Sequence, residues 1–199
     1  TPAKCCYFKG GNREIDPCAK KSTRLDLVTL YHVTAHTQRG VTRDQNEDAC
    51  SIGRVVIFGD KPDVISLNLD DGDLPILITI ADGIGGHRGG EIASRTTVEA
   101  LSQLTKNSID KSRITNAILD VHRKLQDLEI EGQTYNAMGT TIVGALLDLD
   151  RALFFNVGDS RAYRIQNNQI DQISTDDVRA GGNSSVITQC LGGGISTFP

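Results

Sequence analysis

The chain of 199 residues has a formal net charge of −4 and 38% hydrophobic residues, which suits a single domain with a real core. Aromatic residues make up 5% and tryptophan is absent, so this acidic chain offers neither the charge nor the stacking surface of a nucleic-acid-binding protein. No apolar run approaches the roughly 20 residues of a membrane span and no signal-peptide pattern occurs, so we expect a cytoplasmic protein without a membrane span.

Residues 1–29 are polar, net basic and interrupted by glycine and proline, which predicts an N-terminal extension or linker before a domain at 30–199. Cys5, Cys6 and Cys18 lie in this extension. They offer thiols without a suitably spaced fourth ligand, and the odd total of 5 cysteines argues against a complete disulfide framework. Free thiols are therefore favoured over a zinc site.

The next feature is a polar turn between two strand-like segments at 31–37 and 49–58. Neighbouring strand residues face opposite sides of a sheet, so Glu47 and Asp48 cannot both bind one metal ion unless the strand bulges. One of them is a ligand candidate, and the other would support it without touching the metal. The guanidinium of Arg43 suits a phosphate dianion, although an arginine among acids in a turn is more often simple solvated surface.

The most informative segment begins with the apolar run at 76–81, which predicts a buried strand that ends at Asp82. Five glycines follow between positions 83 and 90, before a predicted helix. A lone carboxylate at the end of a buried strand is costly unless a cation or several donors meet it, and metal coordination is the commonest solution. Gly83 has no side chain, so its carbonyl can approach the same cation.

Two other kinds of glycine-rich phosphate loop do not fit this segment. A dinucleotide-binding fingerprint that starts at Gly83 needs a glycine where the chain has Arg88. A P-loop that ends at Gly90 needs a lysine where the chain has Glu91. A nucleotide-binding switch domain is therefore disfavoured, and a plain strand-to-helix turn with glycines for close packing is the remaining alternative.

Two amphipathic helices are predicted next, at 91–104 and 114–128. Ser112 is the expected N-cap of the second helix. His122 lies at the edge of the apolar face of that helix, where we expect a solvated, structural side chain. Helices that alternate with paired strands favour a layered α+β architecture over a parallel, doubly wound sheet.

A third cluster, at 138–141, opens a predicted strand at 142–149, and a hairpin partner follows at 152–158. Asp159 then follows an apolar strand and a glycine, which gives the chain another carboxylate at a strand end. Repeated carboxylates in this position are typical of an oxygen-ligand site for Mg²⁺ or Mn²⁺. A local turn in which Asp159 pairs with Arg161 explains this residue equally well when it is taken alone.

Together these clusters resemble one family, the metal-dependent protein serine/threonine phosphatases of type 2C, in their bacterial-like form. The resemblance runs in family order from about residue 31 to residue 194, and the motif set is specific. The matching residues are Arg43 with 46–48, the segments 81–87 and 89–94, then 139–141, 157–164, 172–177 and 186–192. The resemblance implies an α+β fold, an αββα four-layer sandwich of two antiparallel sheets flanked by helices, with a binuclear metal site at one edge of the sheets.

The resemblance also implies a role for each site residue. Asp82 would bridge two Mn²⁺ or Mg²⁺ ions, and the Gly83 carbonyl and Asp48 would hold the second of them. Arg43 would bind the substrate phosphate, and Asp159 would serve a third, weaker metal position. The implied reaction is hydrolysis of phosphoserine or phosphothreonine by metal-activated water, without a covalent enzyme intermediate.

Glu47, in line with the strand argument, would support these ligands without binding metal. The sequence departs from the family in two places. Few residues stand between 177 and 186, where a longer flap is usual. The family's C-terminal third, which has two more aspartates, does not follow. We therefore expect either a fragment of an active enzyme or a domain without catalysis. The first would be a phosphatase acting on phosphorylated proteins, among them a kinase or its targets. The second would be a catalytically silent phosphatase-like domain that binds a partner or senses a signal.

Overall fold

The computed structural model describes a strand at residues 7–10 and then residues 31–41, 43–84, 88–104, 109–130, 133–134, 138–179 and 186–193. Cys5, Cys6, Cys18 and most of the extension predicted at 1–29 lie outside these residues. The domain boundary at residue 30 therefore stays a prediction.

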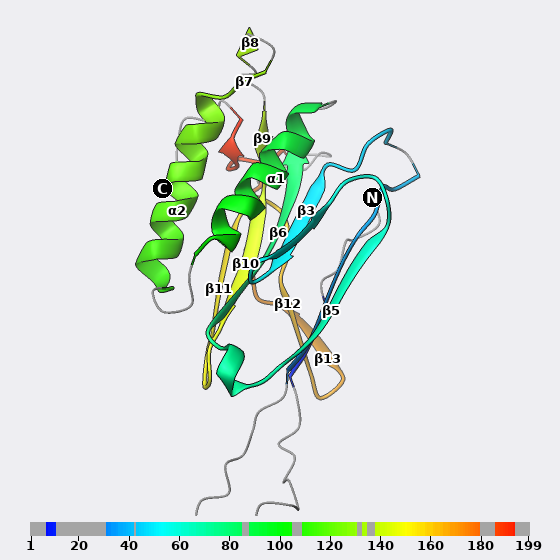
Figure 1. The fold of residues 1–199 in the computed structure, drawn as a ribbon, viewed down its shortest axis with the longest axis vertical. Coiled ribbons are helices and arrows are strands. Elements are labelled where there is room, and N and C mark those ends of the chain that lie inside the picture. Colours follow the sequence, from blue (N-terminus) through cyan, green and yellow to red (C-terminus); the bar gives the residue numbers. More distant parts are fainter. Residues whose placement is uncertain are drawn as a thin grey trace, which may run out of the picture.

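A seven-stranded antiparallel sheet forms the centre of the molecule (Figure 1). Its strands are β3 (Asp48–Ile52), β4 (Val55–Phe58), β6 (Ile76–Ile84), β9 (Gly139–Thr140), β10 (Ile142–Leu147), β11 (Ala152–Val157) and β14 (Leu191–Gly192). The main path runs in the order β11, β10, β6, β3, β4, while β9 pairs with both β6 and β14. The apolar run that predicted a buried strand therefore forms the central strand of that path.

A smaller antiparallel sheet packs against the larger one. It contains β1 (Tyr7–Gly10), β2 (Tyr31–Thr37) and β5 (Asp63–Leu69), with β2 in the centre. Alternate residues of β2 are buried, as expected for a strand with one face on a core. The core between the two sheets consists of Val33, Ala35, Cys50, Ile52, Ile57, Leu69, Leu74, Ile78 and Leu147.

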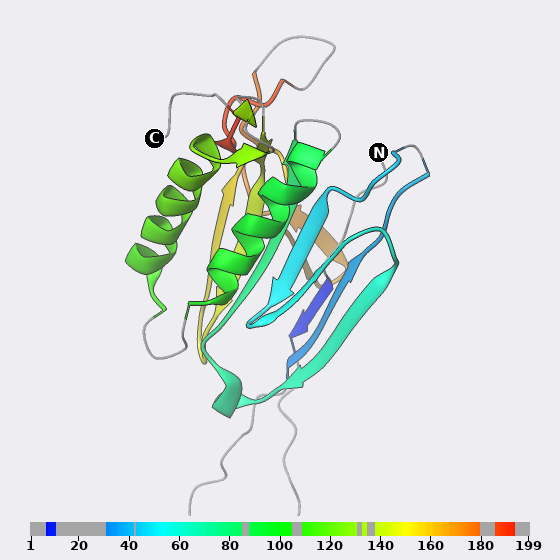
Figure 2. The same cartoon turned by 45° about the horizontal axis from the view of Figure 1, so that its top comes forward.

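Two helices, α1 (Arg88–Ser102) and α2 (Lys111–Gln126), cover the other face of the larger sheet (Figure 2). A second core fills the space between them and that sheet, made of Leu77, Ala93, Leu101, Ile114, Ile118, Val121, Leu125, Met138, Ile142, Leu146 and Leu191. The α+β class and the two packed antiparallel sheets are confirmed, and the described residues form three layers of the expected sandwich. No described helix is long and apolar enough to cross a membrane.

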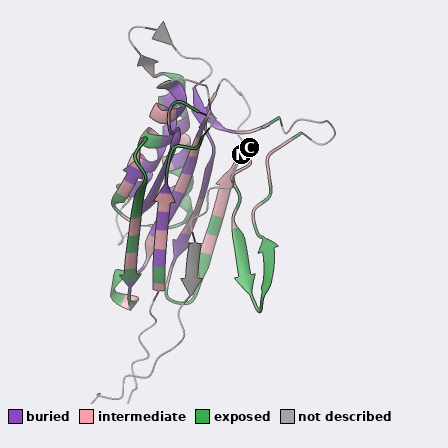
Figure 3. Cartoon of the chain, turned by 90° about the vertical axis from the view of Figure 1, so that its right-hand side faces the viewer, coloured by how far each residue is buried: buried purple, intermediate pink, exposed green. Residues whose placement is uncertain are grey.

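The remaining elements are short. They are the 3₁₀ helix η1 (Asp71–Asp73), the hairpin of β7 (Glu129–Ile130) with β8 (Gln133–Thr134), and the hairpin of β12 (Tyr163–Gln166) with β13 (Gln169–Gln172). The turn between β12 and β13 has Asn167 and Asn168 at φ of 51° and 61°, the left-handed conformation that tight hairpins use. Every residue of β12 and β13 is exposed (Figure 3).

Two predicted strands have different limits in the structure. The segment expected as one strand at 49–58 is the hairpin of β3 and β4, with Gly53 at φ of 56° in the turn. The strand expected to end at Asp82 continues to Ile84, because the last residues of β6 pair with β9. Asp82 therefore lies inside a paired strand rather than at its end.

The second helix also starts differently from the prediction. Its N-cap is Asp110, whose carboxylate accepts a hydrogen bond from the N–H of Arg113 at 2.8 Å. Ser112, the expected cap, lies inside the first turn of α2. Both residue types cap helices well, and the extended backbone of Asp110 decides between them.

His122 joins α2 to β14. The sequence predicts a solvated side chain here, but His122 is buried, at 8% exposure. Its Nδ1 accepts a hydrogen bond from the N–H of Gly192 at 3.1 Å, which requires Nδ1 to be unprotonated. Burial lowers the pKa of His122, and the positive charge of Arg123 lowers it further. The folded protein therefore holds this imidazole neutral.

We expect the free energy of unfolding to fall as the pH drops below about 6.5, because the unfolded chain then binds a proton that folded His122 does not bind. Each pKa unit of difference is worth about 1.4 kcal/mol. His122→Asn keeps an acceptor near Nδ1 but cannot titrate, so its thermal unfolding temperature should vary less between about pH 5.5 and 7.5. His36→Asn on β2 is the control, and an equal pH dependence of wild type and His122→Asn would contradict this expectation.

Candidate metal centre

Asp48 and Asp82 lie directly opposite each other on the paired strands β3 and β6. Residues in such a pair project from the same face of the sheet, with Cβ atoms about 5 Å apart. Their neighbours Ala49 and Ala81 occupy the opposite face, where they pack with Val98 of α1. The two carboxylates therefore point away from the helices, on the side of the smaller sheet.

This arrangement fits a divalent cation. Asp48 is buried at 4% exposure and Asp82 is partly buried, so two carboxylates lie opposite each other where the protein covers most of their surface. Like charges placed directly opposite are destabilising, and a cation between them would offset that repulsion. Carboxylate oxygens are the ligands that Mg²⁺ and Mn²⁺ prefer. In the described part of the chain, no three histidine, cysteine, aspartate or glutamate side chains gather closely enough to hold an ion by themselves.

Gly83 allows the first turn of α1 to lie directly against β6. Its N–H donates to the carbonyl of Glu47 at 2.9 Å. A Cβ at Gly83 would lie 2.1 Å from the carbonyl oxygen of Gly90 and 2.7 Å from that of Glu47. Close packing thus accounts for Gly83 and Gly90, while the glycines at 85–86 lie outside the described residues.

Glu47, the residue before Asp48, forms an ion pair with Arg43. The Glu47 side chain is 7% exposed, whereas that of Arg43 is 52% exposed. A Cβ on Gly90 would meet Oε1 of Glu47 at 3.0 Å, so this carboxylate also lies against the first turn of α1. A guanidinium and a helix N-terminus both favour its negative charge. The structure thus directs Glu47 toward Arg43 and α1.

Asp159 lies at the same end of the sheet, after β11. Gly158, which precedes it, has φ of 106° and packs so tightly that a Cβ there would lie 2.7 Å from Cγ2 of Thr141. Burial raises the pKa of the Asp159 carboxyl, and the negative charge of Asp82 also raises it. β10 separates β11 from β6, so Asp159 shares the region of Asp82 without joining the Asp48 and Asp82 pair.

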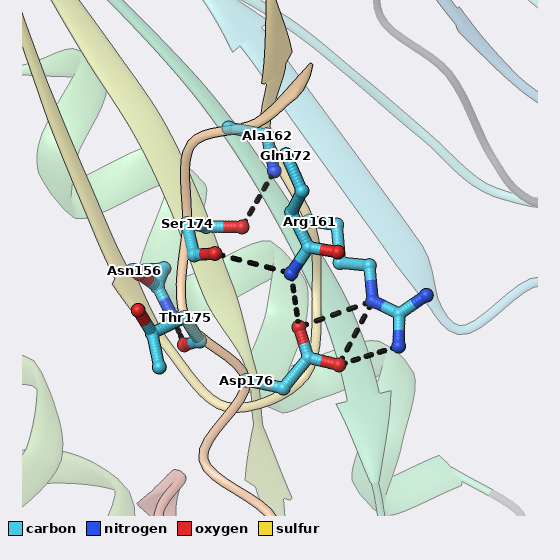
Figure 4. A network of polar contacts seen from close by, with 7 residues as sticks. All are labelled: Asn156, Arg161, Ala162, Gln172, Ser174, Thr175 and Asp176. Carbon is cyan, nitrogen blue, oxygen red and sulfur yellow. Dashed lines mark hydrogen bonds and ion pairs between the residues drawn. The ribbon is translucent and has the colours of Figure 1, made fainter. Parts of the chain in front are cut away.

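Arg161 pairs with Asp176 rather than with Asp159 (Figure 4). Its Nε donates to Oδ2 of Asp176 at 2.8 Å and to Oδ1 at 3.0 Å, and this hydrogen bonding lowers the pKa of Asp176. Gln172 donates to the same carboxylate at 2.8 Å. These hydrogen bonds connect the β12–β13 hairpin to the segment that follows it. The ion pair between Arg161 and Asp159, considered as an alternative from the sequence, does not form.

Two polar residues at the site had no role in the sequence predictions. Asn46 is 2% exposed, and its side-chain amide donates to Oγ1 of Thr37 and to the carbonyl of Gly59, each at 2.8 Å. Its Oδ1 accepts from the N–H of Asp48 at 3.2 Å. Thr140 is fully buried, and its hydroxyl donates to the carbonyl of Asp82 at 2.9 Å. The place of Asn46 next to Glu47 and Asp48 is a signal in the sequence, whereas Thr140 has no acid nearby. The burial of both side chains depends on long-range pairing.

Sequence comparison relates this geometry to known proteins. The sequence model of the family described as "Protein phosphatase 2C" matches residues 63–189. The serine/threonine phosphatase stp of Listeria welshimeri is 33% identical over 153 residues, which are 73% of this chain and 54% of that protein. The serine/threonine protein phosphatase PstP of Mycobacterium tuberculosis is 29% identical over 159 residues, 77% of this chain and 26% of that protein. The chain thus spans about half the length of the Listeria relative.

Solved structures of bacterial serine/threonine phosphatases have a similar fold. Serine/threonine phosphatase Stp1 from Staphylococcus aureus matches with a TM-score of 0.61 and 28% identity, covering 80% of this chain and 65% of that one. The catalytic domain of PstP, solved with two manganese ions, matches with a TM-score of 0.55 and 26% identity, covering 76% of this chain and 57% of that one.

Gly83→Ala should lower the free energy of unfolding by about 1–3 kcal/mol, because the added methyl group meets two backbone carbonyls, that of Gly90 in α1 and that of Glu47 just before β3. Urea denaturation measures the change. Gly40→Ala is the matched control, since a Cβ at Gly40 meets nothing within 4 Å. Equal stability of the two variants would contradict the close contact between α1 and β6 at Gly83.

Proposed function

Because the chain belongs to the protein phosphatase 2C family, we propose that it forms part of a metal-dependent phosphatase that hydrolyses phosphoserine and phosphothreonine in proteins. The observation that carries this proposal is the placement of Asp48 directly opposite Asp82 on paired strands. Two carboxylates held opposite each other, one of them almost fully buried, suit a divalent cation better than a neutral ligand. Relatives named as serine/threonine phosphatases support the reaction class.

We assign Asp48, Asp82 and the Gly83 carbonyl to a Mn²⁺ or Mg²⁺ site, with Asp82 shared between two ions. Bound divalent ions supply a coordinated water of lowered pKa and neutralise charge on a phosphoryl group. The chain itself contributes a rigid pair of carboxylates, because β3 and β6 are neighbouring inner strands and Asp48 is almost fully buried. Water and substrate oxygens would complete the coordination, as is usual for Mg²⁺.

Arg43 is assigned to substrate phosphate. Its side chain is about half exposed, so the guanidinium can reach solvent while Glu47, the residue before Asp48, holds one of its nitrogens. A planar fork of donors suits phosphate oxygens, and the ion pair limits the directions that the fork can take. Glu47 thus acts through Arg43 and the first turn of α1. The proposed substrates are phosphorylated proteins, among them a kinase or its targets.

Asp159 is assigned to a third, weaker cation position. Its carboxylate feels the charge of Asp82 but lies after a strand that β10 separates from β6. A cation held there would have fewer protein ligands than one between Asp48 and Asp82, which supports the weaker affinity.

A catalytically silent phosphatase-like domain is the second candidate. The observation that favours it is that, among the described side chains, no third ligand residue joins Asp48 and Asp82. Such a domain would bind a partner or sense a signal without turnover. Phosphopeptide hydrolysis that requires Mn²⁺ and is lost on substitution of Asp82 would exclude this candidate.

Asp82→Asn should abolish high-affinity Mn²⁺ binding in calorimetry and phosphopeptide hydrolysis together, because it removes the carboxylate assigned to both ions. Asp48→Asn should weaken Mn²⁺ binding and reduce its stoichiometry. Asp150→Asn, in the exposed turn after β10, is the control and should change neither quantity. An unaltered Mn²⁺ stoichiometry in Asp82→Asn would refute the site.

Arg43→Ala should raise KM for a phosphopeptide about 10- to 100-fold and change kcat less, since a hydrogen bond to a charged group is worth about 1.5–3 kcal/mol. Arg39→Ala is the matched control in the same loop, where the guanidinium donates only to the carbonyl of Asp44 among the described partners. A KM for Arg43→Ala equal to that of the control would make Arg43 a surface residue.

A further inference from the structure

Both backbone polar groups of Asp82 are held by the junction between β9 and β10. The Asp82 carbonyl accepts from the hydroxyl of Thr140 and from the N–H of Thr141, each at 2.9 Å. The Asp82 N–H donates to Oγ1 of Thr141 at 3.2 Å. In a regular sheet, a carbonyl of the neighbouring strand would accept this N–H. Here the side-chain hydroxyl of Thr141 accepts it instead. The position of Asp82 depends on that hydroxyl.

The Thr141 hydroxyl also reaches the segment that carries Asp159. Oγ1 of Thr141 lies 2.7 Å from Oγ of Ser160, the residue after Asp159. Thr141 is 1% exposed, so water does not compete for its hydroxyl. Because Oγ1 already accepts from the N–H of Asp82, donation of its own hydrogen to Ser160 satisfies all three groups. Hydrogen bonds connected in this way strengthen one another.

The strand end beside Ser160 has little freedom. Gly158 packs on the Thr141 side chain so closely that a Cβ there would lie 2.7 Å from Cγ2. Asp177 accepts from the N–H of Gly158 at 2.8 Å and donates its own N–H to the carbonyl of Gly158 at 2.9 Å. The contact between Thr141 and Ser160 therefore joins two fixed backbone segments, the one that holds the backbone of Asp82 and the one that contains Asp159.

We propose that Thr141 and Ser160 form a positioning pair that sets the separation of the Asp82 and Asp159 carboxylates. This inference rests on the proposed function, because it concerns how the assigned ligands are held. Neither hydroxyl is a catalytic group. Loss of either one shifts Asp82 relative to Asp159 and weakens cation binding and kcat, while KM for the phosphopeptide, assigned to Arg43, changes little.

The test compares Thr141→Val, Ser160→Ala, the double variant and Thr141→Ser. Thr79→Val is the matched control, because Thr79 lies on the same strand as Asp82 and forms another buried hydroxyl pair, with Ser51 at 2.8 Å. That pair lies on the helix-facing side of the sheet, together with Ala81. The three measurements are Mn²⁺ affinity by calorimetry, kcat and KM with a phosphopeptide, and exchange of the Asp82 amide hydrogen in metal-free protein.

Thr141→Val should weaken Mn²⁺ binding about tenfold or more, as substitutions behind metal ligands do, and should speed exchange of the Asp82 amide. Ser160→Ala should act in the same direction, and the double variant should be no worse than Thr141→Val, because the two hydroxyls act as one unit. Thr141→Ser should restore Mn²⁺ affinity. Thr79→Val should lower the unfolding temperature without changing Mn²⁺ affinity.

Equal Mn²⁺ affinity in Thr141→Val, Thr79→Val and wild type would overturn the positioning pair, and so would additive losses in the double variant. If Asp82→Asn abolishes Mn²⁺ binding in the same experiment, only this inference fails. If Asp82→Asn binds Mn²⁺ as well as wild type does, the metal site and the proposed function fail with it.

Discussion

The register between β3 and β6 is the constraint on which the candidate metal centre depends. Strand residues alternate between faces, so a slip of one residue would turn Asp48 from the side of the smaller sheet to the side of the helices. Packing prevents the slip. Ala49 and Ala81 are completely buried under Val98 on one face, and larger apolar side chains fill the space between the sheets on the other. The apolar cores thus maintain the repulsive pair of carboxylates, because no alternative register buries the same surface.

Close backbone contact is the second requirement of the site. At Gly83 the first turn of α1 reaches β6, and at Gly158 the end of β11 reaches Thr141. The first contact brings α1 against the strand that carries Asp82, and the second brings the end of β11 against Thr141, so a methyl group at either position would separate the two elements. The helical layer therefore does more than cover the sheet, since its N-terminal turn also lies against Glu47 and so stabilises the loop before Asp48.

Local patterns in the sequence were enough to find the elements and the acidic residues, because apolar runs, alternation and glycine clusters report local structure. These patterns do not predict that Asp82 lies inside β6, because the end of that strand forms only by pairing with β9, more than fifty residues away along the chain. The alternative from the sequence that pairs Arg161 with the nearby Asp159 does not hold, because the hairpin brings Asp176 to Arg161 from 15 residues away. The burial of His122 likewise depends on β14, which pattern analysis of α2 does not include. The assignment of metal ligands stays a prediction, since it concerns an ion and not the chain alone.

The exposed hairpin of β12 and β13 has a consequence for how this sequence can evolve. Its strands bury no side chain, so most substitutions there carry little cost in folding and should accumulate freely among homologues. Arg161 and Asp176 are the exception, because the Asp176 side chain is only 14% exposed and loses its charged partner when Arg161 is replaced. These two positions should therefore vary less among homologues than the hairpin residues between them.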